Sequence, residues 1–247
     1  MPSRPGSCPQ LLGLAVHEFR TPVGVVAGYV RMLLKYHQEA LGEAQRQLLE
    51  ETERSCERLA ALIAGLSDLA NLEAGTVTLR AQRVDLFGLA RDVASSVPEG
   101  RDRGVRTEVR GAEQSAGITG DFDRLRAALQ AVVTGVLRER VTACTVLLQC
   151  GIRATADRPT AWILVGDEAL VHRRWDLIPR GWGRFNEWRG GLGFVLPTAA
   201  RVIALHGGRL WSPRGEAARG AAAISLPLPE ATRDLRAGSR EPKAVLA

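Results

Sequence analysis

The chain has 247 residues, a net charge of +6, 45% hydrophobic and 24% charged residues. This balance is typical of a soluble globular protein with one large domain or two small ones. We find no apolar run of the ~18 residues that a membrane-spanning helix needs and no signal-peptide core at the start. We therefore expect a cytoplasmic protein. The positive charge comes almost entirely from Arg, without a dense basic run or an aromatic RNA-binding pattern, so no direct nucleic-acid binding is expected.

The four cysteines are too irregularly spaced for a metal site or a disulfide framework. Cys8, Cys56, Cys144 and Cys150 form no C-x-x-C pair, and no His stands at ligand spacing from them. We expect buried free thiols and no metal bound by this chain.

In chain order, the sequence divides into four regions. Residues 1–9 form a loose lead-in, residues 10–75 two helices (10–38 and 43–74), residues 76–229 a mixed α/β region, and residues 230–247 a polar tail. Within the third region, helical runs alternate with short β-rich runs. The helical runs are 86–97, 123–138 and 192–205, and the β-rich runs are 77–80, 105–109, 145–150, 162–165, 209–211 and 223–226. The pattern predicts an α+β fold, in which a helical hairpin precedes an α/β sandwich.

Both predicted helices carry an apolar stripe with heptad spacing. The stripe of the first helix is Leu12, Val16, Phe19, Val23, Val26, Val30 and Leu33, and that of the second is Leu59, Leu62, Leu66 and Leu69. A lone hairpin buries too little apolar area to be stable, whereas two hairpins would bury both stripes in a four-helix bundle. We expect a homodimer through residues 10–75. Alternatively, the α/β domain covers the stripes within a monomer.

A histidine lies beside this stripe, on a face that should be exposed. The heptad places His17, Glu18 and Thr21 away from the seam, and Pro22 should bend the helix there. A neutral imidazole is a good nucleophile toward a phosphoryl group, and a neighbouring carboxylate can accept or orient its proton. This arrangement is suited to phosphoryl transfer.

The residues around this histidine resemble the H-box of bacterial two-component histidine kinases. The string His17-Glu18-Phe19-Arg20-Thr21-Pro22 fits the pattern H-E-[LFI]-[RK]-[TN]-P at each position, and 68–75 resembles the end of the family's phosphotransfer hairpin. The resemblance implies that His17 is the phosphoacceptor, that Glu18 is the base assisting transfer, and that Thr21 positions water for dephosphorylation of a partner.

The third region resembles the ATP-binding domain of the same family, a Bergerat-type sandwich, with its nucleotide motifs eroded. The resemblance rests on 120–125, 204–210 and 224–229. Ala131 and Gly135 occupy the places of the two N-box asparagines, and neither can offer Mg²⁺ an oxygen ligand. Of the later motifs, the resemblance implies that Asp167 contacts the adenine amino group and that Gly191 and Gly193 lie near the phosphates. The two glycines fit a tight strand-to-helix connection equally well.

Between these motifs, residues 171–189 are rich in aromatic side chains. They include Trp175, Trp182, Phe185 and Trp188. The segment either packs down over the vacant site, which we favour, or docks a partner.

By this resemblance we expect a phosphorelay protein, a pseudokinase-like histidine phosphotransferase. It would carry phosphoryl groups on His17 to or from response-regulator receiver domains, with little or no autophosphorylation by ATP. The receiver would supply the Mg²⁺, a hybrid kinase is a further expected partner, and no sensor domain is expected before the hairpin. The expected docking face contains Gly24, Ala27 and Arg31 with 62–69. Two alternatives stay open: an active kinase with an atypical ATP site, and a non-enzymatic adaptor for a response regulator or kinase.

Overall fold

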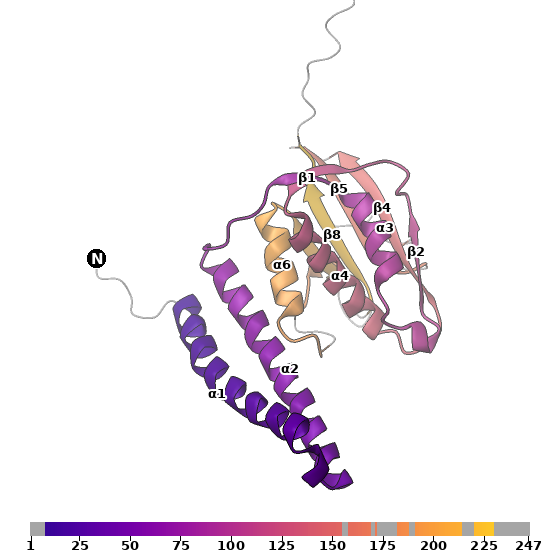
Figure 1. Ribbon diagram of the computed structural model, residues 1–247. Coiled ribbons are helices and arrows are strands. Elements are labelled where there is room, and N and C mark those ends of the chain that lie inside the picture. The colour runs from indigo at the N-terminus through magenta and orange to yellow at the C-terminus, as the bar shows by residue number, and fades with distance from the viewer. Residues whose placement is uncertain are drawn as a thin grey trace, which may run out of the picture.

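The chain folds into a helical hairpin that stands beside an α/β domain (Figure 1). The computed structural model describes residues 8–154, 158–168, 171, 182–187, 191–213 and 220–229. Helix α1 (Cys8–Tyr36) and helix α2 (Glu43–Glu73) form the hairpin, joined through a short 3-10 turn at Gln38–Ala40. This architecture confirms the predicted fold class. Among the described helices, none is both long and apolar enough to cross a membrane.

Local sequence signals account for the ends of the hairpin helices. At the start of α2, the backbone N–H of Gly42 donates to the Gln45 side chain over 3.0 Å, which satisfies a backbone donor. Beyond its C-terminus, Gly75 adopts a φ of 69°, a left-handed conformation that favours glycine. Helix α1 continues through Pro22 and curves along its length (Figure 1).

The apolar residues predicted to form one stripe on α1 face in two directions, some toward α2 and some toward solvent. Val16 and Val30 are buried in the hairpin, whereas Phe19, Val26 and Leu33 are 57%, 48% and 40% exposed. In a four-helix bundle each helix contacts two neighbours, so successive heptad positions face different helices. The α/β domain therefore leaves half of the stripe uncovered, and the monomeric alternative is wrong for these residues.

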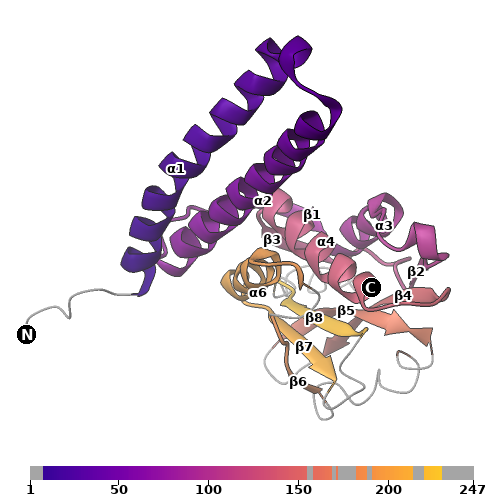
Figure 2. The same cartoon turned by 90° about the horizontal axis from the view of Figure 1, so that it is seen from below.

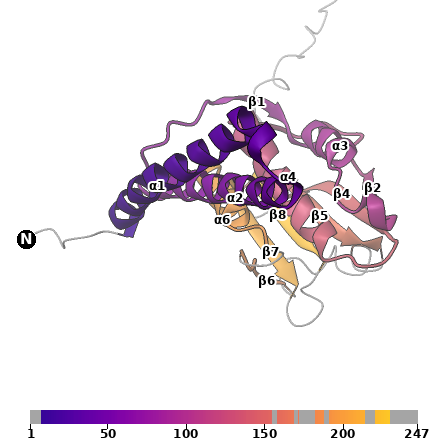
Figure 3. The same cartoon turned by 60° about the horizontal axis from the view of Figure 1, so that its bottom comes forward.

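The α/β domain is built on a six-stranded mixed sheet with the strand order β2-β4-β5-β8-β7-β6. The β2–β4 pair is parallel and the others are antiparallel. The strands are β2 (Arg106–Arg110), β4 (Thr145–Ala154), β5 (Pro159–Asp167), β6 (Trp182–Arg184), β7 (Arg209–Pro213) and β8 (Ala222–Pro227). Helices α3 (Leu86–Ser96), α4 (Phe122–Arg138) and α6 (Val195–Leu205) cover one face and enclose the main core (Figures 2 and 3).

A separate two-stranded ladder joins β1 (Gln82–Asp85) to β3 (Gly117–Gly120). Residues 77–80 were predicted as a strand, and this prediction is wrong. Val77 and Leu79 alternate inward like strand residues, but this stretch is extended without a pairing partner and leads into β1. Sequence alternation reports which side chains turn inward, and it does not report whether a neighbouring strand is present.

The opposite face of the sheet carries a smaller core that includes part of the aromatic segment. Trp182 packs there with Trp162 and Leu164 and is 2% exposed. Phe185 is 4% exposed and joins the main core. Both residues are thus buried in cores of the domain, which does not test whether the segment covers the vacant nucleotide site, and Trp175 and Trp188 lie outside the described residues.

The prediction of buried free thiols agrees with the structure at two of the three cysteines whose side chains are described. Cys56 and Cys150 are buried free thiols, and Cys144 is half-buried and free. Burial raises the pKa of the Cys150 thiol to about 12, so Cys150 is not a thiolate nucleophile at neutral pH.

The α/β domain is docked on α2 rather than on α1 (Figures 1 and 2). Asp68 of α2 pairs with Arg124 of α4, each carboxylate oxygen lying 3.2 Å from Nη1, and Glu73 pairs with Arg201 of α6 at 3.5 Å. A methyl group added at Gly65 would touch Phe194 at 3.4 Å. Ion pairs and close packing thus hold the two parts together.

Candidate functional site

His17 lies on the solvent-facing side of α1 next to a carboxylate. Its side chain is 79% exposed, that of Glu18 is 69% exposed, and Nδ1 lies 3.6 Å from Glu18 Oε1. Thr21 is exposed one turn further along the helix. At 3.6 Å the two groups are in contact but too far apart for a good hydrogen bond. A small ring rotation would let Nδ1–H donate to Glu18 and leave the Nε2 lone pair directed at solvent. The geometry suits attack by Nε2 on an approaching electrophile.

Two glycines follow His17 along the same face of the helix. Gly24 and Gly28 are exposed, and a methyl group added at either would meet no atom of the described part of the chain within 4 Å. Arg31 is exposed and lies 3.6 Å from Glu53 of α2. Ala27, however, is only 6% exposed because it packs inside the hairpin. Its predicted place on the docking face is therefore wrong.

Part of the predicted docking face on α2 already contacts the α/β domain. Leu62 lies against Gly193, where an added methyl group would approach Leu62 Cδ2 to 2.9 Å, and Asp68 pairs with Arg124. In this arrangement the segment 62–69 is shared between the hairpin and the α/β domain.

The places of the N-box asparagines are occupied by apolar packing. Ala131 is 5% exposed and Gly135 is buried, both on α4. A methyl group at Gly135 would lie 3.4 Å from Leu192 and 3.5 Å from Leu196. Leucine side chains therefore line the space beside Gly135, and the described residues contain no cluster of three metal-ligating side chains. This lining does not fit a hydrated Mg²⁺, which needs oxygen ligands.

Asp167, at the end of β5, has an internal cationic partner. Its Oδ2 lies 3.1 Å from Nη1 of Arg140, which follows α4. Sequence reasoning missed Arg140. The available signal was the adjacent charged pair Glu139-Arg140 directly after the α4 helix, but sequence alone does not place it near a residue on another strand.

The two glycines that were expected near phosphate differ in their surroundings. Gly191 and Gly193 both have positive φ, at 61° and 57°, which glycine tolerates best. An added methyl group at Gly191 would meet no atom of the described residues within 4 Å, whereas Gly193 is held against Leu62 of the hairpin. Of the residues predicted to contact nucleotide, Asp167 and Gly193 are thus engaged in internal contacts.

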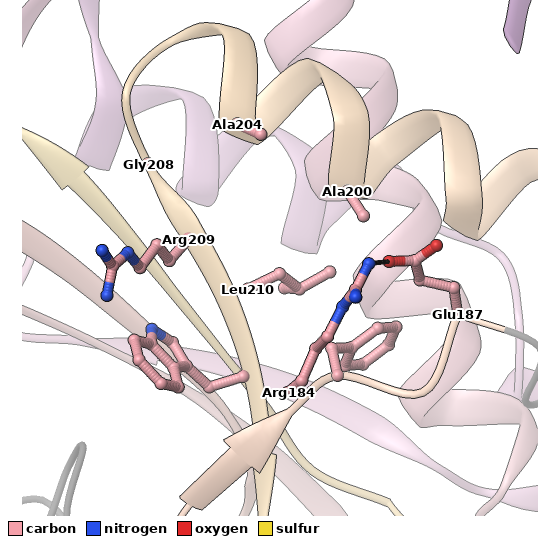
Figure 4. A pocket seen from close by; sticks show the side chains of 9 residues that line it. Arg184, Glu187, Ala200, Ala204, Gly208, Arg209 and Leu210 are labelled. Carbon is pink, nitrogen blue, oxygen red and sulfur yellow. Dashed lines mark hydrogen bonds and ion pairs between the residues drawn. The ribbon is translucent and has the colours of Figure 1, made fainter. Parts of the chain in front are cut away.

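A separate cavity of about 250 Å³ lies between α6 and strands β6 and β7 (Figure 4). Ala200, Ala204 and Leu210 line it with apolar groups. Arg184 and Glu187 form a 3.4 Å ion pair at its border. Its lining contains none of the residues predicted to act in phosphoryl transfer or nucleotide binding.

Comparison with known proteins gives one matching family model and several relatives. Residues 10–75 match the His Kinase A (phospho-acceptor) domain. The chain is 27% identical over 124 residues to the swarming motility regulation sensor protein RssA of Serratia marcescens, which covers 50% of this chain and 25% of RssA. It is 25% identical over 209 residues to the circadian input-output histidine kinase CikA of Synechococcus elongatus, which covers 81% of this chain and 27% of CikA. The chain thus spans about a quarter of the length of these curated relatives.

Solved structures agree with these relatives. Full-length ShkA in complex with AMPPNP superposes with a TM-score of 0.67 at 25% identity, over 94% of this chain and 48% of ShkA. The Acinetobacter baumannii histidine kinase AdeS gives 0.52 at 16% identity, over 86% of this chain and 98% of that chain, a likeness of fold alone. Fold and site define a phosphoacceptor hairpin joined to a kinase-like α/β domain. Residues 10–75 form a His Kinase A (phospho-acceptor) domain, and the chain as a whole resembles sensor histidine kinases in sequence and fold.

Proposed function

We propose that the chain is a dimeric, cytoplasmic phosphorelay protein that carries phosphoryl groups on His17 to or from response-regulator receiver domains, with little or no autophosphorylation by ATP. The observation that carries this proposal is the contrast between the two halves. His17, Glu18 and Thr21 lie together on an exposed helix face, whereas leucines pack against the N-box place at Gly135.

In the proposed transfer, Nε2 of neutral His17 attacks the phosphorus of a receiver's aspartyl phosphate. The P–N bond forms, the P–O bond to the aspartate breaks, and the carboxylate of the receiver leaves with the electron pair. Glu18 accepts or orients the Nδ1 proton as the ring gains positive charge. Receiver-bound Mg²⁺ would supply the charge neutralisation that this chain's own residues do not provide. In a separate hydrolysis, Thr21 positions a water that attacks the phosphorus of the receiver's aspartyl phosphate, so that the P–O bond to the aspartate breaks, the carboxylate leaves and inorganic phosphate is released.

The exposed half of the α1 stripe supports a dimer through residues 10–75. Phe19, Val26 and Leu33 of the stripe, together with the neighbouring exposed Tyr29, form an apolar face that the α/β domain leaves uncovered. A second copy of the hairpin would bury this face and keep His17 outside the seam.

The test is a phosphotransfer assay on the full chain, with ³²P supplied either as ATP with Mg²⁺ or as a pre-labelled receiver domain. We expect acid-labile label from the receiver only. The label should be lost in His17→Gln and kept in His37→Gln, a matched control at another exposed histidine of the hairpin. Failure to label from a receiver that the chain binds would contradict the relay and support an adaptor.

A second candidate function, an active kinase with an atypical nucleotide site, is favoured by one observation. The ShkA structure contains AMPPNP and resembles this chain over 94% of this chain's length. Asp167, Gly191 and Gly193 are also still present in the sequence. Label transferred from ATP to His17 without any receiver would replace our proposal with this one.

A further inference from the structure

Three segments of the chain meet around the guanidinium of Arg140. Nη1 lies 3.1 Å from Asp167 Oδ2 at the end of β5, and Nη2 donates to the carbonyl of Gly220, just before β8. The side chain of the neighbouring Glu139 accepts a hydrogen bond from the backbone N–H of Gly220. The two residues that follow α4 therefore bind both the N–H and the carbonyl of this glycine. The Arg140 side chain is only 19% exposed.

The close approach requires a glycine. A methyl group added at Gly220 would lie 2.6 Å from both Cζ and Nε of Arg140, a separation that carbon atoms do not tolerate. Gly220 also has a φ of 70°, in the left-handed region. The backbone before β8 is therefore shaped around the guanidinium.

The burial of Arg140 carries a cost that the ion pair only partly offsets. Its Nε is buried and has no hydrogen-bond partner among the described residues, and a buried donor without a partner is unfavourable. A half-buried ion pair with an unsatisfied donor is an inefficient way to stabilise a fold. Stability therefore does not account for this arrangement, and we look for its role in the position of the guanidinium beside Asp167.

We propose that Arg140 is an internal occupant of the Asp167 site and excludes adenine nucleotides from it. A carboxylate only accepts hydrogen bonds, and an adenine would offer it a neutral amino group. A guanidinium offers the same carboxylate a charge-assisted bond, which is the stronger of the two. Because Arg140 is part of the chain, its effective concentration at Asp167 far exceeds that of a free ligand. The inference deepens the proposed function by naming the residue that closes the nucleotide site.

The experiment measures binding of ADP, without added Mg²⁺, to the full chain by isothermal titration calorimetry. We expect no detectable binding to the wild type and a gain of at least ~10-fold in affinity, equivalent to ~1.4 kcal/mol, in Arg140→Ser. The gain should vanish in Arg140→Ser combined with Asp167→Asn. Arg138→Ser is the matched control, since Arg138 lies at the same helix end but pairs with Glu99 at 3.1 Å.

Two outcomes would overturn the proposal: an Arg140→Ser variant that is folded by circular dichroism yet gains no ADP binding, or wild-type binding that Asp167→Asn abolishes. If Arg140→Ser does not fold, Arg140→Gln retains a donor for the Gly220 carbonyl and removes the charge, and it is held to the same criteria. The result is independent of the phosphotransfer assay. Loss of receiver-dependent labelling at His17 would refute the proposed function and leave the role of Arg140 standing.

Discussion

At the scale of single residues, Asp121 joins three segments of the α/β domain. It is 6% exposed, caps α4 by accepting from Arg124 N at 3.1 Å, and accepts from Arg80 N at 3.0 Å. Its own N–H donates to Nε2 of His206 at 3.0 Å. The sequence predicted a helix starting near this residue. The link to His206, 85 positions away, was not predictable, because local patterns carry no information on which distant turn approaches a helix start.

We predict that Asp121→Asn destabilises the chain and flattens the acid side of its pH dependence. Burial opposes ionisation of Asp121, but the backbone N–H groups of Arg80 and Arg124, together with the nearby cationic side chains, outweigh it and hold the pKa of the carboxyl below its usual value. A lowered pKa adds stability above the unfolded-state value, and this stability is lost as pH falls through the folded-state value. An amide offers one acceptor oxygen for two N–H groups, so we expect a loss of about 1–2 kcal/mol at neutral pH.

Urea unfolding followed by circular dichroism between about pH 7 and pH 2 measures this effect. The free energy of unfolding of the wild type should fall more steeply than that of Asp121→Asn below about pH 4. Asp123→Asn is the control, at an exposed position in the first turn of the same helix. Its free energy of unfolding should depend on pH in the same way as that of the wild type. If the free energy of unfolding of Asp121→Asn depended on pH as that of the wild type does, the ionised Asp121 carboxylate would not be the source of this stability.

At the scale of elements, α1 shows what a heptad pattern can and cannot predict. The spacing correctly predicted a long amphipathic helix and the exposure of His17 and Thr21. It did not separate Val23, which is half-buried within the hairpin, from Val26, which is 48% exposed. Both belong to one stripe in sequence, and only the position of the second helix assigns them to different neighbours.

We predict that Val26→Glu dissociates the dimer without unfolding the hairpin. Burial of one Val side chain stabilises the dimer by ~1.5 kcal/mol, and a two-fold dimer buries two copies of Val26. The dissociation constant should therefore rise on the order of 100-fold. Size-exclusion chromatography with light scattering gives the mass. Gly28→Glu adds the same charge on the polar face of α1, where the surroundings are open, and should remain dimeric. A dimeric Val26→Glu would place the seam elsewhere, whereas Val23→Glu should lower helicity as well.

At the scale of the whole molecule, the α/β domain is held on the hairpin by contacts between distant parts of the sequence. Asp68 and Arg124 are 56 residues apart, and Leu62 meets Gly193. The sequence predicted the two parts separately, from periodicity and from motif resemblance. It could not predict their docking, because each contact depends on the orientation of one finished unit against another.

We predict that Asp68→Arg shifts the chain toward an undocked arrangement and that adding Arg124→Asp restores docking. The pair is partly exposed, so its coupling should be about 0.5–1 kcal/mol, equivalent to a roughly two- to five-fold change in the docked-to-undocked ratio. Small-angle scattering should report a larger radius of gyration for the single variant and recovery in the double variant. Glu57→Arg, at an exposed position of α2, is the control. A double variant as expanded as the single one would rule out this pair as the determinant.

The contact between Arg140 and Asp167 also bears on how the protein responds to cellular energy supply. A domain that binds a free ligand gains stability by mass action, so its folded population follows the ligand concentration. A site filled by the chain's own guanidinium has an occupant whose local concentration never changes. The folded population and shape of this domain would then not change with the ratio of ATP to ADP. Phosphoryl transfer to and from His17 would depend on the phosphorylation state of its partners alone.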